Sequence, residues 1–378
     1  MRIAYVFDQL LPRTAADTEQ VVSTVSALGK AGVDVDLVLP RARGVAPVDA
    51  AALGQWYDVE PNFTVHTVGS LYPAHRGLEK AGHAVAGALA EATRHADLVY
   101  TRNIPVLLAL LARARQPIVY EHFRPWPTQS RAMALLFSGI ARMRQPPALV
   151  MHSAFAAQSY LDVGFAPERT LVAHNGWDPK LMEPVLDRAA ARAACRIDFG
   201  GPVVLYSGHI NERKGLGTLL DLAQTFRDAR FVLVGSEGHG PIEARAAGLP
   251  NVEVRPWCSR RELVPLLYAA DILAVPPTSG PLQKVGNTVL PLKTFIYLAA
   301  GRAIFAGDTP DLHELLRDGD NARLARPDDA TDARRVMGEL LADEALRAHL
   351  GDRARASAQS LTWAARGRRL AAFLEGLR

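Results

Sequence analysis

Cysteine, long apolar runs and a strong excess of one charge are all scarce in this chain of 378 residues. The two cysteines, Cys195 and Cys258, are too few for a disulfide framework and too widely spaced for a paired metal or redox motif. The longer apolar stretches, such as residues 106–112, fall far short of the ~20 residues that span a bilayer. We therefore expect neither a disulfide-rich domain nor a membrane-spanning helix.

The charge balance points to few classes of partner. The formal net charge is +4 and the pI is about 9.1, and the arginines are spread through alanine-rich segments without interleaved aromatics. We therefore expect no nucleic-acid partner. Residues 1–8 read as a strand that ends in Asp8 rather than as a secretory signal. These features predict a cytoplasmic protein, and its length predicts two domains.

Short β-branched runs alternate with alanine- and leucine-rich runs in two successive blocks of the chain. The first block predicts strands at 2–7, 33–39, 98–100 and 117–120, and helices at 18–32, 78–95 and 105–115. The second block predicts strands at 203–206, 231–234, 252–255, 272–275 and 303–306, and helices at 216–226, 241–247, 260–269 and 292–300. This alternation predicts an α/β fold with two doubly wound, Rossmann-like domains, each a parallel sheet covered by helices on both faces.

The segment "GHINERKG", residues 208–215, joins a buried strand to a helix at the start of the second block. Gly208 and Gly215 bracket the turn, and Lys214 places a positive charge where the helix presents free N–H groups. A second glycine-rich loop with Gly235 follows the next strand. Ligands of such sheets bind outside the carboxyl ends of the strands. The two loops therefore predict a phosphate site, whereas the first segment alone would also fit a plain turn with a solvated lysine.

Four further segments follow in a characteristic order, and they read "NGWD" at 175–178, "YAADILAVPP" at 268–277, "PLKTFIYLAAGRAIFAGD" at 291–308 and "LTWAARGRRLAAFLEGL" at 361–377. Together with the loop at 208–215, they resemble the retaining glycosyltransferases of family 4. The resemblance implies the GT-B fold, in which two Rossmann-like domains face each other across a cleft and the second binds the nucleotide-sugar. It also implies that the closing helix crosses back to the first domain.

The resemblance divides the chain into four parts. Residues 1–178 would form the acceptor-side domain and residues 179–200 a connecting segment. Residues 201–357 would form the nucleotide-sugar-binding domain, and residues 358–378 the closing helix. The turn-rich stretch at 172–179 marks the expected boundary.

The resemblance also implies which residues bind the donor. Lys214 would contact the donor diphosphate and serve as a catalytic residue, and His209 stands where many members have arginine. The amino end of the helix at 292–300 would add backbone donors, so that the leaving group is stabilised without metal. We expect no cofactor and no metal site, because no His/Cys cluster with the spacing of metal ligands is present. The implied donor-binding set is Gly208, His209, Lys214, Gly235, Glu237, Asn287, Thr288 and Lys293.

The sequence departs from the family at its best-known feature, a pair of glutamates that contact the donor sugar and the ribose. The corresponding positions here are Thr288 and Ile296. A donor in the usual pose would leave buried hydroxyls unpaired, at about 1–3 kcal/mol each. Three explanations stay open, in this order: Asn287 or Glu237 supplies the contact, the donor is unusual, or the protein no longer transfers sugars. Ile296 by itself fits an apolar position that faces the sheet.

The first block contributes candidates for the acceptor side. The strand at 117–120 ends at Glu121 and His122, and the resemblance makes His122 a catalytic residue that hydrogen-bonds a sugar hydroxyl or stabilises developing charge. A histidine that satisfies loop carbonyls is an equal alternative. Arg13 and Thr14, in the loop after the first strand, are the acceptor-side candidates. Ser153 is expected to cap a helix.

Two connections of the first block bear on the acceptor. Residues 124–127, Arg-Pro-Trp-Pro, lie in a connection expected to shape the acceptor site. Residues 131–144 are apolar with arginines at 131, 142 and 144, which fits either peripheral contact with an anionic membrane or, more commonly, a core helix with exposed ends.

The function that the sequence predicts is transfer of a sugar from a nucleoside diphosphate sugar to a hydroxyl acceptor, with retention of configuration. The acceptor would be a sugar, a glycan, a lipid-linked glycan or a small molecule. The alternative is a catalytically silent homologue that binds a nucleotide or glycan or partners an active subunit. A two-lobed periplasmic binding protein is disfavoured by the Lys-Gly loop and the start of the sequence.

Overall fold

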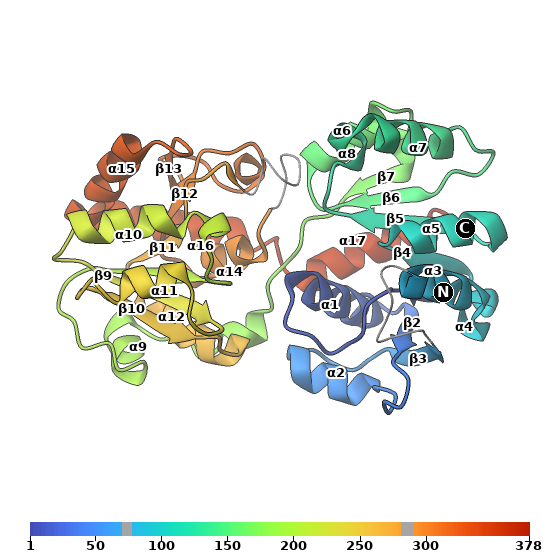
Figure 1. Cartoon of the computed structure of the whole chain (residues 1–378), viewed down its shortest axis with the longest axis horizontal. Coiled ribbons are helices and arrows are strands. Elements are labelled where there is room, and N and C mark those ends of the chain that lie inside the picture. Colours follow the sequence, from blue (N-terminus) through green and yellow to red (C-terminus); the bar gives the residue numbers. More distant parts are fainter. Residues whose placement is uncertain (70–77, 281–289) are drawn as a thin grey trace. The chain divides into compact units, whose positions relative to one another are not determined.

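The computed structural model describes residues 1–69, 78–280 and 290–378. The chain forms two compact units (Figure 1). The first comprises Met1–Asn175 together with Trp363–Arg378, and the second comprises Gly176–Thr362. The chain therefore enters the second unit once, and its last helix returns to the first.

The first unit is built on a parallel sheet of seven strands in the order β3-β2-β1-β4-β5-β6-β7. The order reverses between β1 and β4, which makes the carboxyl ends of these two strands the place where a ligand is expected. The strands are β1 (Arg2–Val6), β2 (Asp34–Arg41), β3 (Thr64–Gly69), β4 (Leu98–Thr101), β5 (Ile118–His122), β6 (Ala148–Met151) and β7 (Thr170–Val172). The helices are α1 (Ala16–Lys30), α2 (Ala50–Tyr57), α3 (Leu78–Leu89), α4 (Glu91–His95), α5 (Ile104–Arg113), α6 (Trp126–Gln129), α7 (Arg131–Ala141), α8 (Ala154–Leu161) and α17 (Trp363–Glu375).

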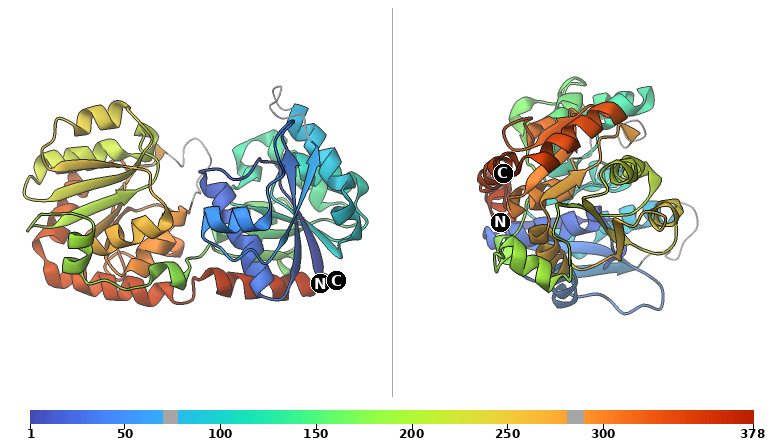
Figure 2. Two further views of the ribbon diagram at one scale, coloured as in Figure 1. Left: turned by 90° about the horizontal axis from the view of Figure 1, so that it is seen from below. Right: turned by 90° about the vertical axis from the view of Figure 1, so that its left-hand side faces the viewer.

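Helix α17 belongs to the core of the first unit although it closes the chain. It packs along α1 so tightly that a Cβ on Gly367 would lie 2.2 Å from the carbonyl oxygen of Ala27. Leu370 and Leu374 are buried in the same apolar cluster as β1. The two termini consequently lie side by side (Figure 2). The prediction that the closing helix crosses back to the first domain is confirmed.

The second unit has a parallel sheet of six strands in the order β10-β9-β8-β11-β12-β13. Its order reverses between β8 and β11, and the carboxyl end of β8 is therefore the expected ligand position. The strands are β8 (Val203–Ser207), β9 (Arg230–Ser236), β10 (Val252–Pro256), β11 (Ile272–Val275), β12 (Ala303–Gly307) and β13 (Arg323–Ala325). The helices are α9 (Arg188–Ala194), α10 (Leu216–Thr225), α11 (Pro241–Ala246), α12 (Arg260–Ala269), α14 (Leu292–Ala300), α15 (Ala330–Ala342) and α16 (Glu344–Ala358).

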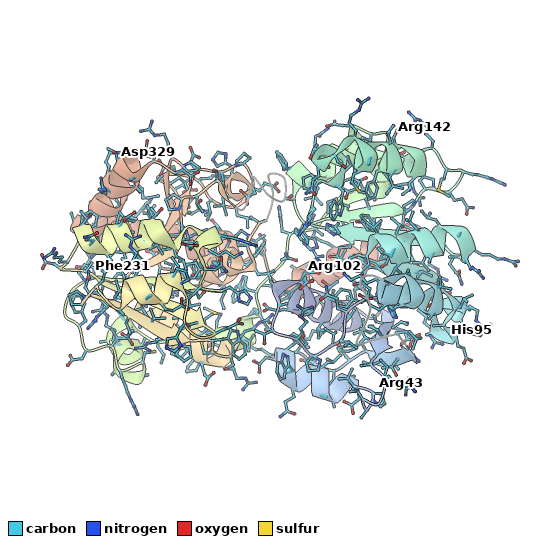
Figure 3. The ribbon with its side chains drawn as sticks, viewed as in Figure 1. Arg43, His95, Arg102, Arg142, Phe231 and Asp329 are labelled. Atoms are coloured by element: carbon cyan, nitrogen blue, oxygen red, sulfur yellow. The ribbon has the colours of Figure 1, made fainter. Side chains whose placement is uncertain are left out.

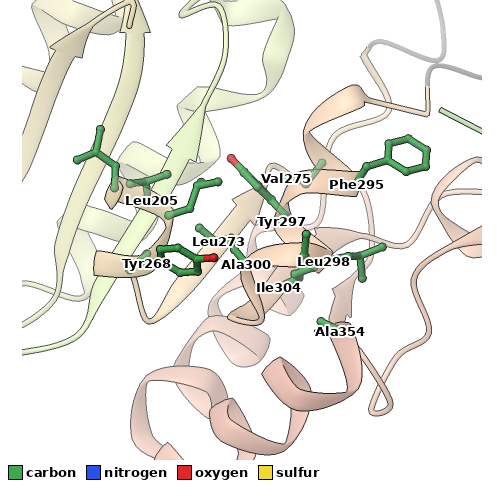
Figure 4. Packing of buried hydrophobic residues seen from close by; sticks show 14 of the residues in the cluster. Leu205, Tyr268, Leu273, Val275, Phe295, Tyr297, Leu298, Ala300, Ile304 and Ala354 are labelled. Atoms are coloured by element: carbon green, nitrogen blue, oxygen red, sulfur yellow. The ribbon is translucent and has the colours of Figure 1, made fainter. Parts of the chain in front are cut away.

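An apolar cluster fixes α14 and α12 on the sheet of the second unit. Figure 4 shows Leu205 and Leu273 from the sheet beside Tyr268 of α12 and Leu298 of α14. All four side chains are at most 1% exposed. Burial of such side chains contributes roughly 1.5–3 kcal/mol each. The amino end of α14 is thereby held at a fixed place beside β8.

The α/β fold with two doubly wound parallel sheets is confirmed, and the differences are local. Strand β5 runs through His122 instead of ending at Tyr120. The single helix expected at 78–95 is two helices, because Ala90 has an extended backbone between them. Helix α7 buries Phe137 but leaves Leu135 73% exposed. In the ranges the structure describes, no helix is both long and apolar enough to cross a membrane.

Candidate functional site

Two glycines bring the loops after β8 and β9 into contact in the second unit. Gly208 has φ of +129° and Gly235 has φ of +120°, a region that side chains rarely adopt. A Cβ on Gly235 would lie 2.4 Å from the carbonyl oxygen of Gly208. Only glycine fits this approach, which leaves Gly208 exposed and Gly235 buried at the carboxyl edge of the sheet.

Gly215 performs a similar task at the start of α10. It caps the helix in a left-handed conformation with φ of +71°, as the sequence led us to expect of a glycine where the helix begins. A Cβ there would lie 2.4 Å from Cγ2 of Thr278, in the loop after β11. Lys214, the residue before it, is exposed at the end of a short 3-10 turn, Glu212–Lys214.

Lys293, in the first turn of α14, points at the same loop. Its Nζ lies 3.7 Å from the ring centroid of Tyr206 and 2.9 Å from where a Cβ on Gly208 would be. Burial, together with the charge of Lys214, holds the pKa of Lys293 well below its usual value. The side chain of Lys214 is exposed overall, but partial desolvation of its ammonium lowers the pKa of Lys214 as well. Within the described ranges no carboxylate pairs with either lysine.

The amino end of α14 faces this region as well. Tyr297 of α14 accepts a hydrogen bond from the backbone N–H of Ser207 at 2.8 Å, which places the helix at the end of β8. The first N–H groups of a helix carry a partial positive charge. Pro291 at the N-cap supplies no side-chain cap. In the described ranges, two lysines without a carboxylate partner, a helix amino end and the exposed Gly208 together form a site suited to a diphosphate.

The remaining residues predicted to bind the donor make fewer contacts with the site around Gly208 and Lys293. His209 Nδ1 lies 3.5 Å from Oε1 of Glu237, and both side chains are about half exposed. Asn287 and Thr288 lie outside the described residues. Ile296 packs its half-buried side chain against the apolar cluster of Figure 4, as its apolar neighbours led us to expect.

The acceptor-side candidates of the first unit lie in the exposed loop between β1 and α1. The backbone N–H of Arg13 donates to the hydroxyl of Tyr57 at 2.9 Å, and its guanidinium donates to Gln9 at 3.0 Å. Thr14 is exposed. Arg13 is thus fixed through its backbone, whereas its charge lies near solvent.

His122, at the carboxyl end of β5, is 8% exposed and faces two N–H donors. Its Nδ1 lies 2.9 Å from the backbone nitrogen of Arg124, and its Nε2 lies 3.3 Å from Nε1 of Trp126. Burial, with the charges of Arg102 and His152, holds the pKa of His122 well below its usual value. A neutral imidazole accepts at one nitrogen only. Since both ring nitrogens face an N–H donor, a neutral His122 accepts only one of the two hydrogen bonds, and the contact with the Arg124 N–H is the shorter.

A buried polar network beside His122 escaped the sequence analysis. Glu121 is fully buried and accepts hydrogen bonds from Tyr5 at 3.0 Å, Gln20 at 2.7 Å and His152 at 2.8 Å, and also from Arg366. Burial alone raises the pKa of Glu121, but Arg366 and His152 outweigh it, and the pKa lies well below the usual value. In the sequence, the only sign of this network was the pair Glu121-His122 at the end of the strand, because the residues that donate to Glu121 come from distant segments.

Arg102 is a second residue that the sequence analysis missed. It directly follows β4 and is 4% exposed, and Figure 3 labels it within the first unit. Its guanidinium and that of Arg124 both lie over the ring of Phe123, at 5.6 and 5.2 Å from the centroid. In the sequence, the only sign of this residue was an arginine directly after the apolar run of β4.

Two further expectations concern capping and metal binding. Ser153 caps α8 by accepting a hydrogen bond from the backbone N–H of Ala156 at 3.1 Å, which confirms its predicted role. Among the residues that the structure describes, no group of three or more His, Cys, Asp or Glu side chains is arranged to hold a metal ion.

Comparison with known protein families matches both halves of the chain. A family model described as "Glycosyltransferase Family 4" matches residues 19–181. A model described as "Glycosyl transferases group 1" matches residues 201–343. The two matches cover the loops that hold His122 and the donor-side candidates, whereas Arg13 and Thr14 precede the first matched residue.

Several curated proteins are similar over about half of the chain. A D-inositol 3-phosphate glycosyltransferase of Streptomyces scabiei is 26% identical over 214 residues, which are 52% of this chain and 46% of that protein. One from Corynebacterium aurimucosum is 30% identical over 219 residues, or 53% of this chain and 49% of that protein. The chain thus spans less than half the length of the curated relatives it matches.

Solved structures match over the whole chain at low identity. Anabaena Alr3699/HepE in complex with UDP has a TM-score of 0.75 at 18% identity and covers all of both chains. Sucrose-phosphate synthase of Thermosynechococcus elongatus has a TM-score of 0.78 at 18% identity, over 100% of this chain and 98% of that one. At such identities the likeness shows the fold. With the family matches in both halves, this chain belongs to the family 4 glycosyltransferases and has the GT-B fold.

Proposed function

We propose that the protein transfers a sugar from a nucleoside diphosphate sugar to a hydroxyl acceptor, with retention of configuration and without a metal ion or cofactor. The observation that carries the proposal is the pairing of Lys214 and Lys293, two cations without carboxylate partners in the described ranges, beside the amino end of α14. Such a site binds a diphosphate before reaction and stabilises it more strongly as it departs with growing charge.

The chemistry needs little from the first unit beyond positioning. The bond from the anomeric carbon to the diphosphate oxygen breaks, and a bond to the acceptor oxygen forms on the same face. The acceptor proton passes to an oxygen of the leaving diphosphate. His122, whose two ring nitrogens face N–H donors of Arg124 and Trp126, would help to position the transferred sugar and would not act as a base. Retention and same-face attack rest on the family resemblance.

Uridine diphosphate is the first nucleotide to test. The Anabaena structures are described as complexes with UDP, with UDP-glucose, and with UDP and glucose. The exposed backbone of Gly208 and Gly238, in the loops after β8 and β9, suits a flat base in either a purine or a pyrimidine nucleotide. The preferred base is therefore determined by comparing the affinities of a series of nucleotides and not from the geometry of the loops.

The missing glutamates favour a second candidate, a homologue that binds the donor without turning it over. Ile296 packs into the apolar cluster and offers no acceptor to a ribose hydroxyl. In the active enzyme, Glu237 would supply that contact, and it is held only by an exposed pairing with His209. A Glu237→Gln variant with unchanged affinity for UDP would remove Glu237 from this role.

The proposals for the acceptor and for the cellular location rest on the sequence alone. We propose a sugar or glycan acceptor bound by the first unit, with Arg13 and Thr14 at the edge of its site. A cytoplasmic location and peripheral membrane contact through residues 131–144 are separate predictions, and localisation in cells tests them.

The test is a calorimetric titration of UDP, GDP, ADP, TDP and CMP, and of their common sugars. We expect one diphosphate to bind the wild type and Lys214→Ala to weaken it by at least about tenfold. Arg227→Ala is the matched control, because it removes an exposed cation at the far end of α10. Equal binding by wild type and Lys214→Ala contradicts the proposed site. Binding without hydrolysis or transfer of the sugar supports the silent homologue.

A further inference from the structure

An aspartate in the loop after β13 has an unusual backbone conformation. Asp328 has φ of +60°, in the left-handed region that favours glycine and that other residues adopt at a cost. Asp328 is not needed to cap α15, because Asp329 is the N-cap and accepts hydrogen bonds from the N–H groups of Thr331 and Asp332. The strained conformation of Asp328 therefore has another cause.

Asp328 holds the segment that follows β11, residues 276–280. Its backbone N–H donates to the carbonyl oxygen of Pro277 at 2.9 Å. Its carboxylate accepts from the backbone N–H of Ser279 at 3.1 Å and from the hydroxyl of Ser279. Partial burial raises the pKa of the Asp328 carboxyl, but hydrogen bonds from Ser279 and Thr278 outweigh it, and the pKa lies below its usual value. Asp328 therefore fixes the segment at two points.

These contacts carry segment 276–280 across the end of β12. The strand order places β12 between β11 and β13. Strand β12 ends at Gly307, where a Cβ would lie 3.0 Å from the Cα of Pro277. A side chain at Gly307 would crowd the backbone of the segment. The chain after β11 can therefore pass over β12 and reach the loop of Asp328.

The same segment packs against the loop that carries Lys214. A Cβ on Gly215 would lie 2.8 Å from the Cβ of Thr278, and a Cβ on Gly280 would lie 3.7 Å from the carbonyl oxygen of Arg213. Lys214 thus lies between two residues that contact the segment. Partial desolvation of its ammonium, which lowers the pKa of Lys214, agrees with this packing.

We propose that Asp328 is a positioning residue for the diphosphate site, and that it acts through segment 276–280 to hold Lys214 in place. This inference rests on the proposed function, which assigns Lys214 to the donor diphosphate. A lysine loop that is already fixed loses less conformational freedom when it binds an anion, so binding is tighter. The carboxylate of Asp328 is bound to Ser279 and not to Lys214, which keeps its positive charge for the donor.

The first experiment measures the pKa of Lys214 in the protein without ligand. Competitive acetylation followed by mass spectrometry gives the pKa of a single lysine. Asp328→Gly suits the positive φ but removes the carboxylate, so segment 276–280 loses an anchor and Lys214 becomes better hydrated. We expect the pKa of Lys214 to rise toward its usual value, because desolvation is what lowers it. An unchanged pKa of Lys214 in Asp328→Gly overturns the proposal.

Asp58→Gly is the matched control, because Asp58 in the first unit is another aspartate with positive φ, at +53°. It makes the same chemical change at a left-handed residue and should leave the pKa of Lys214 as in the wild type. Asp328→Asn tolerates the same backbone and keeps an oxygen that can accept from Ser279, so it should give an intermediate pKa. If Asp58→Gly shifts the pKa of Lys214 as far as Asp328→Gly does, the effect is general and the proposal is wrong.

The second experiment is a double-mutant cycle on UDP binding, measured by calorimetry. We expect Asp328→Gly to weaken UDP binding by at least about fivefold in the wild-type background and to cause no further loss in Lys214→Ala. Wild-type affinity in Asp328→Gly, or equal losses in both backgrounds, contradicts the proposal. The two proposals fail separately. A wild type that binds no nucleoside diphosphate refutes the proposed donor site, whereas the pKa of Lys214 still tests the role of Asp328.

Discussion

Arg366 and Glu121 stand 245 residues apart in the chain, and the guanidinium of Arg366 donates a hydrogen bond to the buried carboxylate of Glu121. Arg366 belongs to α17 and also donates to the carbonyl oxygens of Ala173 and His174. Glu121 immediately precedes His122 in β5. The last helix of the chain therefore fixes the strand end that carries a proposed substrate contact.

Removing Arg366 should destabilise the first unit strongly. Arg366→Met leaves Glu121 buried without its main positive partner, and breaking a buried pair from one side costs about 3–5 kcal/mol. Arg368→Met on the same helix is the control, because Arg368 is exposed. Urea unfolding monitored by tryptophan fluorescence measures both. Equal midpoints for the two variants would show that the network, rather than Arg366, maintains Glu121.

Stability should fall in mild acid because of His83. This side chain is fully buried and hydrogen-bonds the carbonyl oxygen of Phe7 at 2.7 Å, and burial lowers the pKa of His83 to about 4. The unfolded chain takes up this proton near pH 6.5, whereas the folded one does so only near its lower pKa. The contribution is complete above about pH 6.5 and is lost as the pH falls toward about 4, by roughly 3 kcal/mol in all.

The His83→Gln variant isolates that effect. It removes the titration, so the difference in unfolding free energy between variant and wild type should shift in favour of the variant from about pH 7 to about pH 4. Urea midpoints at several pH values between these limits measure the shift. His152, whose pKa burial also lowers to about 4, titrates in both proteins and cancels in the difference. A pH-independent difference would mean that His83 titrates as an exposed histidine does.

The sequence predicted the two sheets and the glycine-rich donor loops because these features are local. Gly208, Lys214 and Gly215 lie within eight residues of each other. The periodicity of apolar residues and the residue types typical of turns identify such segments. The contact between Gly235 and the carbonyl of Gly208 depends instead on the pairing of β8 with β9.

The contacts of Arg102 and Arg124 with Phe123 and the Glu121 network could not be predicted in the same way. Arg102, Phe123 and Arg124 meet only because β4 pairs with β5. Arg366 reaches Glu121 only because α17 packs against α1. No short sequence window contains both members of either contact, so the charge balance of each site becomes visible only in the fold.

Gly235 should tolerate no side chain. Gly235→Ala forces a residue with φ of +120° to carry a Cβ 2.4 Å from the carbonyl oxygen of Gly208, which costs roughly 1–3 kcal/mol in backbone strain alone. We expect a lower unfolding midpoint and loss of UDP binding. Gly217→Ala is the control, since its Cβ would meet only the Arg245 side chain at 3.7 Å, and alanine favours a helix. Wild-type affinity in Gly235→Ala would show that the loop can open without harm to the site.

Donor binding should take up protons through Lys293. Burial and Lys214 hold the pKa of Lys293 well below its usual value in the free protein, so a fraction of this side chain is neutral at alkaline pH. A bound diphosphate stabilises the ammonium and raises that pKa, and by linkage the affinity must rise as the pH falls. Calorimetry at about pH 8 in two buffers with different ionisation enthalpies counts the protons taken up.

Lys293→Met distinguishes this mechanism from a general effect of charge. The variant keeps a side chain that can pack against Tyr206 but cannot be protonated, so the proton uptake should disappear and the affinity should fall by about tenfold or more. Arg227→Met, which removes an exposed charge of the same unit, should retain the uptake. If Lys293→Met and wild type take up equal numbers of protons, the ammonium is already charged in the free protein. Lys293 would then bind the diphosphate as a permanent cation, and the affinity would not depend on its protonation.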